Sequence, residues 1–181
     1  MEGRNRIVLW LILIAAIVSI SSAGAVFQLM SDVDPMLRSS WRFQLTALFM
    51  FPLFIYQTKE GMKNSEFVQM LKEKETIYII FGSGLSLGLH MGAWVWSLDN
   101  TSLTHSLLFV TIHPLIIVTG ALLFRYFVPK KQIIGAIVGF AGGSIALLGI
   151  SSESDATIIG DLAAVLGAFA VVGYFLAGRK L

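Results

Sequence analysis

The sequence has no cysteine and few charged residues: Lys, Arg, Asp and Glu make up 13% of its 181 residues. Without cysteine, the chain offers no disulfide and no thiolate metal ligand, and it carries no information about redox compartment. Hydrophobic residues, by contrast, make up 56% of the chain, and the mean hydropathy is +0.79. This composition excludes an ordinary soluble globular domain and is typical of a membrane protein.

The long apolar runs predict how often the chain crosses the membrane. A helix needs roughly 20 residues, at about 1.5 Å each, to cross about 30 Å of hydrocarbon. The strand alternation of a membrane barrel is missing, so helices are favoured. We therefore expect an all-α polytopic membrane protein with six transmembrane helices. They run approximately over residues 7–30, 36–57, 76–98, 103–128, 132–150 and 160–177.

The first apolar segment permits a second interpretation. The stretch "RNRIVLWLILIAAIVSISSAGA" has basic residues, an apolar run and small residues near a cleavage point, as a secretory signal has. Its apolar run continues through "VFQLM" to transmembrane length, which favours a retained helix. Cleavage would leave the orientation of the other five helices unchanged.

Lys and Arg are distributed unevenly between the connections. Eleven of the thirteen fall on one side if the helices alternate, and the opposite connections contain acidic charges without Lys or Arg. The basic residues are Arg4, Arg6, Lys59, Lys63, Lys72, Lys74, Arg125, Lys130, Lys131, Arg179 and Lys180, and the acidic ones are Asp32, Asp34, Asp99, Glu153, Asp155 and Asp161. The positive-inside rule therefore predicts that both termini face the cytoplasm.

One connection, residues 58–75, is long. Phe67, Val68 and Leu71 fall within one helical turn of each other among many charges. Two interpretations remain open: a short amphipathic helix on the cytoplasmic surface, or a solvated and partly disordered loop.

Glycine recurs every fourth residue in two of the segments. Such spacing stacks the glycines on one helix face, where a second backbone can approach closely. These predicted helix-packing residues are Gly84, Gly88 and Gly92 in the third segment and Gly135, Gly139 and Gly143 in the fifth. The faces serve either as fixed bundle contacts or as a sliding surface for conformational change.

The second segment opens with "DPMLRSSWR" and carries two arginines. Asp34 is predicted as the N-cap and Pro35 as the first helical residue. Arg38 lies four residues beyond Asp34 and is expected to pair with it. Arg42 lies roughly 10 Å along the axis from Pro35. Its side chain either snorkels outward or makes a structural bond, or it points into a cavity and meets an anionic group.

His90 and His113 are predicted to lie at similar depth in neighbouring helices. The turn "DNTS" makes the third and fourth segments an antiparallel hairpin, and the two histidines differ in distance from it by roughly 3 Å. His90 shares a helix face with Ser86 and Trp94. Three interpretations remain open for His90: a hydrogen bond to a neighbouring helix, a cavity-lining role, or a metal ligand.

The stretch "TIHPL" places a histidine and a proline in the middle of the fourth apolar segment. Pro114 has no N–H, so the carbonyl of Val110 loses its usual partner and the helix is expected to kink. Thr111 and His113 flank this defect and can supply polar groups to it. His105 is eight residues from His113, about 12 Å along the axis, which is too far for both to ligate one metal ion. We expect no metal site and no cofactor.

The order of these features resembles the EamA-like drug/metabolite transporter superfamily. The resemblance is carried by "PMLRSSWRF", by a glycine-rich third segment ending in "WSLDNTSLTHSLLF", by the mid-helix proline, by "QIIGAIVGFAGGSIALLGI" and by "GDLAAVLGAFAVVGYFLAGRKL". Arg42, Pro114 and Gly135 match positions in the family pattern. The family's frequent Glu at the inner end of helix 4 is missing, since Arg125 or Tyr126 stands there.

The resemblance implies a fold of ten helices in two inverted five-helix repeats that moves small metabolites by alternating access. Residues 1–150 would form one such repeat. Residues 151–181 would supply an outer loop and a sixth helix, the start of an incomplete second repeat. The chain is then either a fragment of a longer product or a protomer that needs a partner.

The preferred function is a secondary transporter, or the N-terminal portion of one, that moves a small metabolite. The predicted substrate-cavity residues are Arg42, Ser86, His90, Trp94, Thr111, His113 and Pro114. The alternative is a membrane subunit that does not transport and that packs by its glycine faces in a larger assembly. An intramembrane enzyme is disfavoured because no nucleophile and base motif is visible. Expected partners are the lipid bilayer, a small solute, and the missing repeat or a partner protomer, with no nucleic acid.

Overall fold

The structure, a computed structural model, describes residues 2–148 and 156–180. In these residues helix is the only regular secondary structure, as expected for an all-α protein. The helices are α1 (Glu2–Leu29), α2 (Pro35–Gly61), α3 (Ser65–Lys72), α4 (Lys74–Asn100), α5 (Leu103–Val110), α6 (His113–Leu123), α7 (Lys130–Leu148) and α8 (Ile158–Gly178). The predicted end of the fifth segment at Ile150 and most of the connection that follows it lie outside the described residues.

Each predicted apolar segment coincides with a long helix or, for the fourth segment, with the pair α5 and α6. Four stretches meet both the length and the hydropathy of a membrane span: Arg6–Leu29, Lys74–Asn100, Leu103–Leu123 and Ile158–Gly178. Helices α2 and α7 are long enough to cross but are not among the four. Several polar residues in the first two turns of α2 and two lysines at the start of α7 reduce their apolar character. For α2 and α7, the expected count of six transmembrane helices therefore rests on helix length alone.

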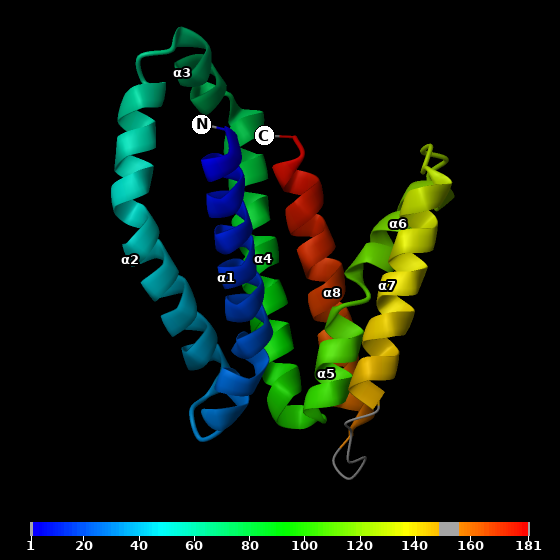
Figure 1. Cartoon of the computed structure of the whole chain (residues 1–181). Helices are drawn as coiled ribbons and strands as arrows, with labels where there is room; N and C mark the ends of the chain where they lie inside the picture. Colours follow the sequence, from blue (N-terminus) through cyan, green and yellow to red (C-terminus); the bar gives the residue numbers. More distant parts are fainter. Residues whose placement is uncertain (1, 149–155, 181) are drawn as a thin grey trace.

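The connections between helices lie at two ends of the molecule (Figure 1). The chain termini, α3 and the α6–α7 connection lie at one end, called the basic end below because eleven of the thirteen Lys and Arg residues lie in or beside these segments. The α1–α2 and α4–α5 connections lie at the other, called the acidic end after Asp34, Asp99 and Asp161. This grouping of charge is the one that the alternation of six segments predicts.

Capping residues fix where several helices begin. Asp34 accepts hydrogen bonds from the backbone N–H groups of Met36 at 2.8 Å and Leu37 at 3.3 Å, and Pro35 is the first residue of α2. This N-cap is confirmed as predicted. The long basic connection contains a helix, α3, capped by Asn64, so the first of its two interpretations holds as far as helix formation is concerned.

The fourth apolar segment is broken rather than merely kinked. Helix α5 ends at Val110 and α6 begins at His113, with Thr111 and Ile112 between them. Pro114 lies in the first turn of α6. Backbone N–H groups in the first turn of a helix have no intrahelical partner, so the missing N–H of proline costs no hydrogen bond there. The disruption that the proline predicts is thus confirmed, and it is complete enough to separate two helices.

Helix α8 makes the most extensive contact in the structure, along α4. Its buried face consists of small and β-branched residues: Gly160, Ala163, Ala164, Gly167, Ala168, Val171 and Val172. A Cβ atom placed on Gly167 would lie 3.3 Å from the carbonyl oxygen of His90, so the two backbones approach closely. Small residues at a membrane helix interface allow this approach.

The predicted glycine faces are not the surfaces that pack within this chain. A Cβ atom on Gly84, Gly88, Gly135, Gly139 or Gly143 would meet no atom within 4 Å among the described residues. Gly92 alone of the six faces a neighbour, the sulfur of Met36 at 3.4 Å. The expectation of tight packing therefore fails for the other five inside the chain, because four-residue spacing defines a helix face but does not specify its partner.

Candidate functional site

Three of the predicted cavity residues come together beside Phe27 of α1. The Cζ atom of Arg42, on α2, lies 5.6 Å from the centroid of the Phe27 ring. The Trp94 ring, on α4, meets Phe27 edge-on at 5.8 Å between centroids, and His90 lies parallel to Trp94 at 6.5 Å. Arg42, Phe27, Trp94 and His90 thus form a continuous cation and aromatic chain across three helices, which we call the Arg42–His90 cluster.

Two polar atoms of this cluster have no hydrogen-bond partner. Nη1 of Arg42 and Nε1 of Trp94 are both buried and unpaired among the described residues. The Trp94 side chain belongs to the apolar core with Phe27 and Met91, and 8% of its surface is exposed. The guanidinium of Arg42 packs on the buried ring of Phe27, while the residue as a whole is half-buried.

His90 and Ser86 turn toward α8. Nδ1 of His90 donates a hydrogen bond to the carbonyl oxygen of Gly167 at 2.8 Å. Ser86 lies against Gly173, where an added Cβ would come within 3.1 Å of its hydroxyl oxygen. Of the interpretations open for His90, the hydrogen bond to a neighbouring helix is therefore present. The same side chain also takes part in the cluster through its stacking on Trp94.

His113 completes the break between α5 and α6. Its Nδ1 donates to the carbonyl oxygen of Val110 at 3.2 Å, so the carbonyl that Pro114 deprives of a partner is satisfied by a side chain. This bond agrees with the expectation that His113 supplies a polar group to the defect. Thr111 is exposed, and its hydroxyl is shared between the carbonyls of Leu107 and Leu108, each at 2.9 Å. Pro114 is also exposed.

The two histidines do not meet in the structure. His113 packs against the ring of Phe175 at 5.8 Å, whereas His90 binds the backbone of Gly167. Both partners belong to α8 and lie eight residues apart, about 12 Å along the helix axis. His90 and His113 therefore both turn toward α8 and contact different parts of that helix.

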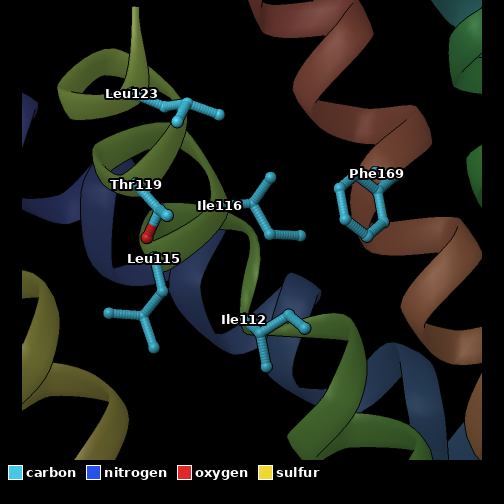
Figure 2. Close-up of a pocket in the computed structure, with 7 residues that line it drawn as sticks. Ile112, Leu115, Ile116, Thr119, Leu123 and Phe169 are labelled. Carbon is cyan, nitrogen blue, oxygen red and sulfur yellow. The ribbon is translucent and has the colours of Figure 1, made fainter. Parts of the chain in front are cut away.

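A cavity of about 420 Å³ lies between α6 and α8. It is lined by Ile112, Leu115, Ile116, Thr119, Gly120, Leu123 and Phe169, and Figure 2 shows Ile116 and Phe169 facing each other across it. None of the predicted cavity residues lines it, and Thr119 is its one polar side chain. The cavity can hold an apolar group, whereas the polar groups that can recognise a charged solute lie in the Arg42–His90 cluster.

Sequence reasoning missed a group of polar contacts at the acidic end. Arg38 is 1% exposed; it pairs with Asp99 of α4 and donates to the carbonyl oxygen of Phe27 at 2.6 Å. The expected pairing with Asp34 is wrong, because that carboxylate caps α2 instead. Arg38 therefore joins α1, α2 and α4 and satisfies a carbonyl in the last turn of α1.

A second contact group ties α8 to the α4–α5 turn. Asp161, in the first turn of α8, accepts a hydrogen bond from the hydroxyl of Thr101 at 2.7 Å and lies 3.0 Å from Nδ1 of His105. The hydroxyl of Thr157 donates to the carbonyl oxygen of Asn100. These partners are separated by more than 50 residues, so no spacing in the sequence pointed to them. The one feature of the sequence that could have indicated these contacts is that the residues involved lie in short polar turns at the same end of the molecule.

The helical architecture and its apolar spans define the chain as an integral, multi-pass membrane protein. The sequence model of the EamA-like transporter family matches residues 5–148. The chain therefore belongs to the EamA-like transporter family, whose members are membrane transporters of the drug/metabolite type and not enzymes. Comparison with curated proteins and with solved structures finds no match. Helix α8 lies beyond the matched residues.

Proposed function

We propose that the chain is a secondary transporter, or the N-terminal portion of one, and that it moves a small metabolite by alternating access. The observation that carries the proposal is the interrupted span Leu103–Leu123, whose break contains Ile112, a residue that also lines the cavity between α6 and α8. Non-helical backbone at membrane depth is tolerated where protein or a cavity surrounds it, and discontinuous helices form the binding sites of many transporters.

The proposed solute path runs beside the Arg42–His90 cluster and the α6–α8 cavity. Its polar contacts are Arg42, Ser86, His90 and Trp94. Thr111 lies in the break, and His113 and Pro114 begin the helix that follows it. A cavity of about 420 Å³ falls within the range of about 300–1,000 Å³ usual for small-molecule sites. We propose that both termini and the basic end face the cytoplasm, on the strength of the Lys and Arg distribution.

Transport is tested with the full-length protein in proteoliposomes. Counterflow of labelled metabolites is measured against liposomes without protein, and Ile116→Trp is compared with Ile134→Trp. Ile116 lines the cavity, whereas Ile134 is 60% exposed on α7. We expect Ile116→Trp to reduce initial uptake at least fivefold and the control to leave it unchanged. Equal uptake by the two variants would remove the cavity from the path.

Orientation has its own test. Cysteines are introduced singly at Lys63 and Asp32, both exposed and at opposite ends. A membrane-impermeant thiol reagent should label the cysteine at position 63 from the cytoplasmic side and the cysteine at position 32 from the other. The chain has no cysteine of its own, so no background labelling interferes. The reverse pattern contradicts the proposed orientation.

A second function is favoured by one observation, the open glycine faces of α4 and α7. Gly84, Gly88, Gly135, Gly139 and Gly143 have no neighbour within 4 Å of an added Cβ among the described residues. Such faces suit a non-transporting subunit that packs in a larger assembly, or the contact with a further repeat or a partner protomer. Stoichiometric co-purification of a partner without counterflow activity favours the subunit, and counterflow by the chain favours the transporter.

A further inference from the structure

Two buried hydrogen-bond donors belong to side chains that contact the same ring, that of Phe27, and neither donor has a partner in the described chain. The guanidinium carbon of Arg42 is 5.6 Å from the centroid of the Phe27 ring, and the centroid of the Trp94 ring is 5.8 Å from it. Nη1 of Arg42 and Nε1 of Trp94 are both buried and unpaired. A buried donor without an acceptor is rare in a folded protein, because its lost hydration costs about 1–3 kcal/mol, and more for a charged group.

The chemistry of the two donors restricts what can satisfy them. Neither the guanidinium of arginine nor the indole N–H of tryptophan can accept a hydrogen bond, so the missing partner must supply acceptor oxygens. Three carboxylates at the acidic end are engaged elsewhere. Asp34 caps α2, Asp99 pairs with Arg38, and Asp161 binds Thr101 and His105.

Arg38 provides an internal contrast on the same helix, one turn before Arg42. Its Nη1 and Nη2 are occupied by the Phe27 carbonyl and the Asp99 carboxylate, and its Nε is the one atom left unpaired. Arg38 is thus a structural residue. Arg42 has the same side chain but forms no ion pair with the described residues, and it lies about 10 Å inside the membrane end of α2. At that depth an unpaired cation is costly, which is why such residues mark solute pathways.

We infer that Arg42 and Trp94 bind the carboxylate of the transported solute, so that the substrate class is small organic monoanions. The inference rests on the proposed transport function. A single guanidinium matches a single carboxylate in charge and in its two-oxygen geometry, whereas a phosphate dianion would remain half-neutralised. The rings of Phe27, Trp94 and His90 line the same cluster and contact an apolar or aromatic body attached to the carboxylate.

Binding is measured on the purified full-length protein by thermal unfolding in detergent. The probes are acetate, hexanoate and phenylacetate, each compared at equal ionic strength with its uncharged amide. We expect the melting temperature to rise with the carboxylates, most with phenylacetate, and not with the amides. Arg42→Met and Trp94→Phe should each weaken the apparent affinity at least tenfold. The matched controls Arg179→Met and Trp41→Phe change exposed residues and should bind as the parent protein does.

A second measurement observes the hydrogen bond of Trp94 directly and does not depend on unfolding the protein. The indole N–H of Trp94 is observed by nuclear magnetic resonance in ¹⁵N-labelled protein and assigned by its loss in Trp94→Phe. Formation of a hydrogen bond to a carboxylate moves this proton resonance downfield. The resonances of Trp10, Trp41 and Trp96 serve as internal references. We expect phenylacetate to shift the Trp94 resonance in the parent protein and not in Arg42→Met.

The outcomes separate this inference from the transport proposal. Carboxylate binding that depends on Arg42, without counterflow, supports the anion site and rejects transport by this chain. Counterflow of uncharged solutes that is unaffected by Arg42→Met supports transport and overturns the anion site. The inference also fails if no carboxylate binds more tightly than its amide. It fails as well if phosphatidylglycerol in mixed micelles shifts the Trp94 resonance and the carboxylates do not, because the bound anion is then a lipid headgroup.

Discussion

The two ends of the molecule are held together in different ways. At the acidic end, side chains join separate helices: Arg38 links α1, α2 and α4, and Asp161 links α8 to the turn after α4. The described residues of the basic end contain one ion pair, between Lys63 and Glu60. These two residues are exposed and only three positions apart on the chain. Exposed pairs of this kind contribute little to stability. The acidic end is called the fixed end of the bundle below, because polar side-chain contacts join separate helices there.

The largest effect is expected from Arg38→Met. Removing the guanidinium leaves Asp99 without its cation and leaves the Phe27 carbonyl with only the backbone N–H of Met30 as a donor. This loss should lower the free energy of unfolding by about 3 kcal/mol. The matched change at the basic end, Lys63→Met, should lower it by less than about 1 kcal/mol. Denaturant unfolding in micelles measures both. Adding Asp99→Asn to Arg38→Met should restore part of the loss, and similar values for Arg38 and Lys63 would abolish the contrast between the ends.

Gly160 at the acidic end and Gly61 at the basic end are two positions where an added methyl group does not fit. Replacing each with alanine compares the rigidity of the two ends. A Cβ on Gly160 would collide with the backbone of Asn100 and would lie 2.6 Å from Cβ of Thr101, whereas a Cβ on Gly61 would lie 2.7 Å from the ring of Phe67. A side chain on the short helix α3 can move, but the backbone at the fixed end cannot. We expect Gly160→Ala to cost about 2 kcal/mol of unfolding free energy and Gly61→Ala less than about 0.5 kcal/mol. The reverse order would place the rigid contact at the basic end.

Asp161→Ala sharpens the comparison at the level of hydrogen bonds. The substitution removes the acceptor for Thr101 and His105 and a negative charge from the first turn of α8, which together should cost about 1.5 kcal/mol. Glu60→Ala removes only an exposed partner of Lys63 and should change stability by about 0.5 kcal/mol or less. Thermal unfolding of the two variants in one detergent provides the measurement. No difference between them would mean that the α8 contacts do not hold the acidic end.

The smallest effect is expected between the two ends, at the open glycine faces. A Cβ atom at Gly88 or Gly139 meets no atom within 4 Å in the described chain, so we expect a leucine at either position to stay within about 1 kcal/mol of the parent. The measurement is again unfolding of the purified chain. A loss of several kcal/mol would show that a second copy or a further segment covers these faces, and it would support the subunit function.

Local features were predictable from the sequence, and contacts between distant residues were not. The Asp34 cap, the disruption at Pro114 and the helix within residues 58–75 each depend on a few consecutive residues, and the structure contains all three. The pairing of Arg38 with Asp99 joins residues 61 positions apart, so no helical periodicity points to it. The nearest acidic residue, Asp34, was the wrong partner because its carboxylate is already used by the backbone.

The cluster was predictable in composition but not in its contacts. Arg42, His90 and Trp94 attracted attention because polar and aromatic groups are unusual in apolar segments. Phe27, which joins Arg42 to Trp94, gave no such signal, since one more phenylalanine in an apolar run is ordinary. The role of α8 was also hidden, because alanine and glycine in "GDLAAVLGAFAVVG" indicate close packing without indicating that α4 is the partner.

The packing of α8 on α4 has a consequence for biogenesis. Helix α4 leaves the ribosome before α5, α6 and α7, and α8 follows them, so the carbonyl of Gly167 does not yet exist when the imidazole of His90 enters the membrane. During that interval the Ser86 and His90 face of α4 must be kept from lipid by water or by the insertion machinery. A nascent chain that stalls before Ile158 then presents an unsatisfied histidine to the bilayer, a feature that membrane quality control can recognise.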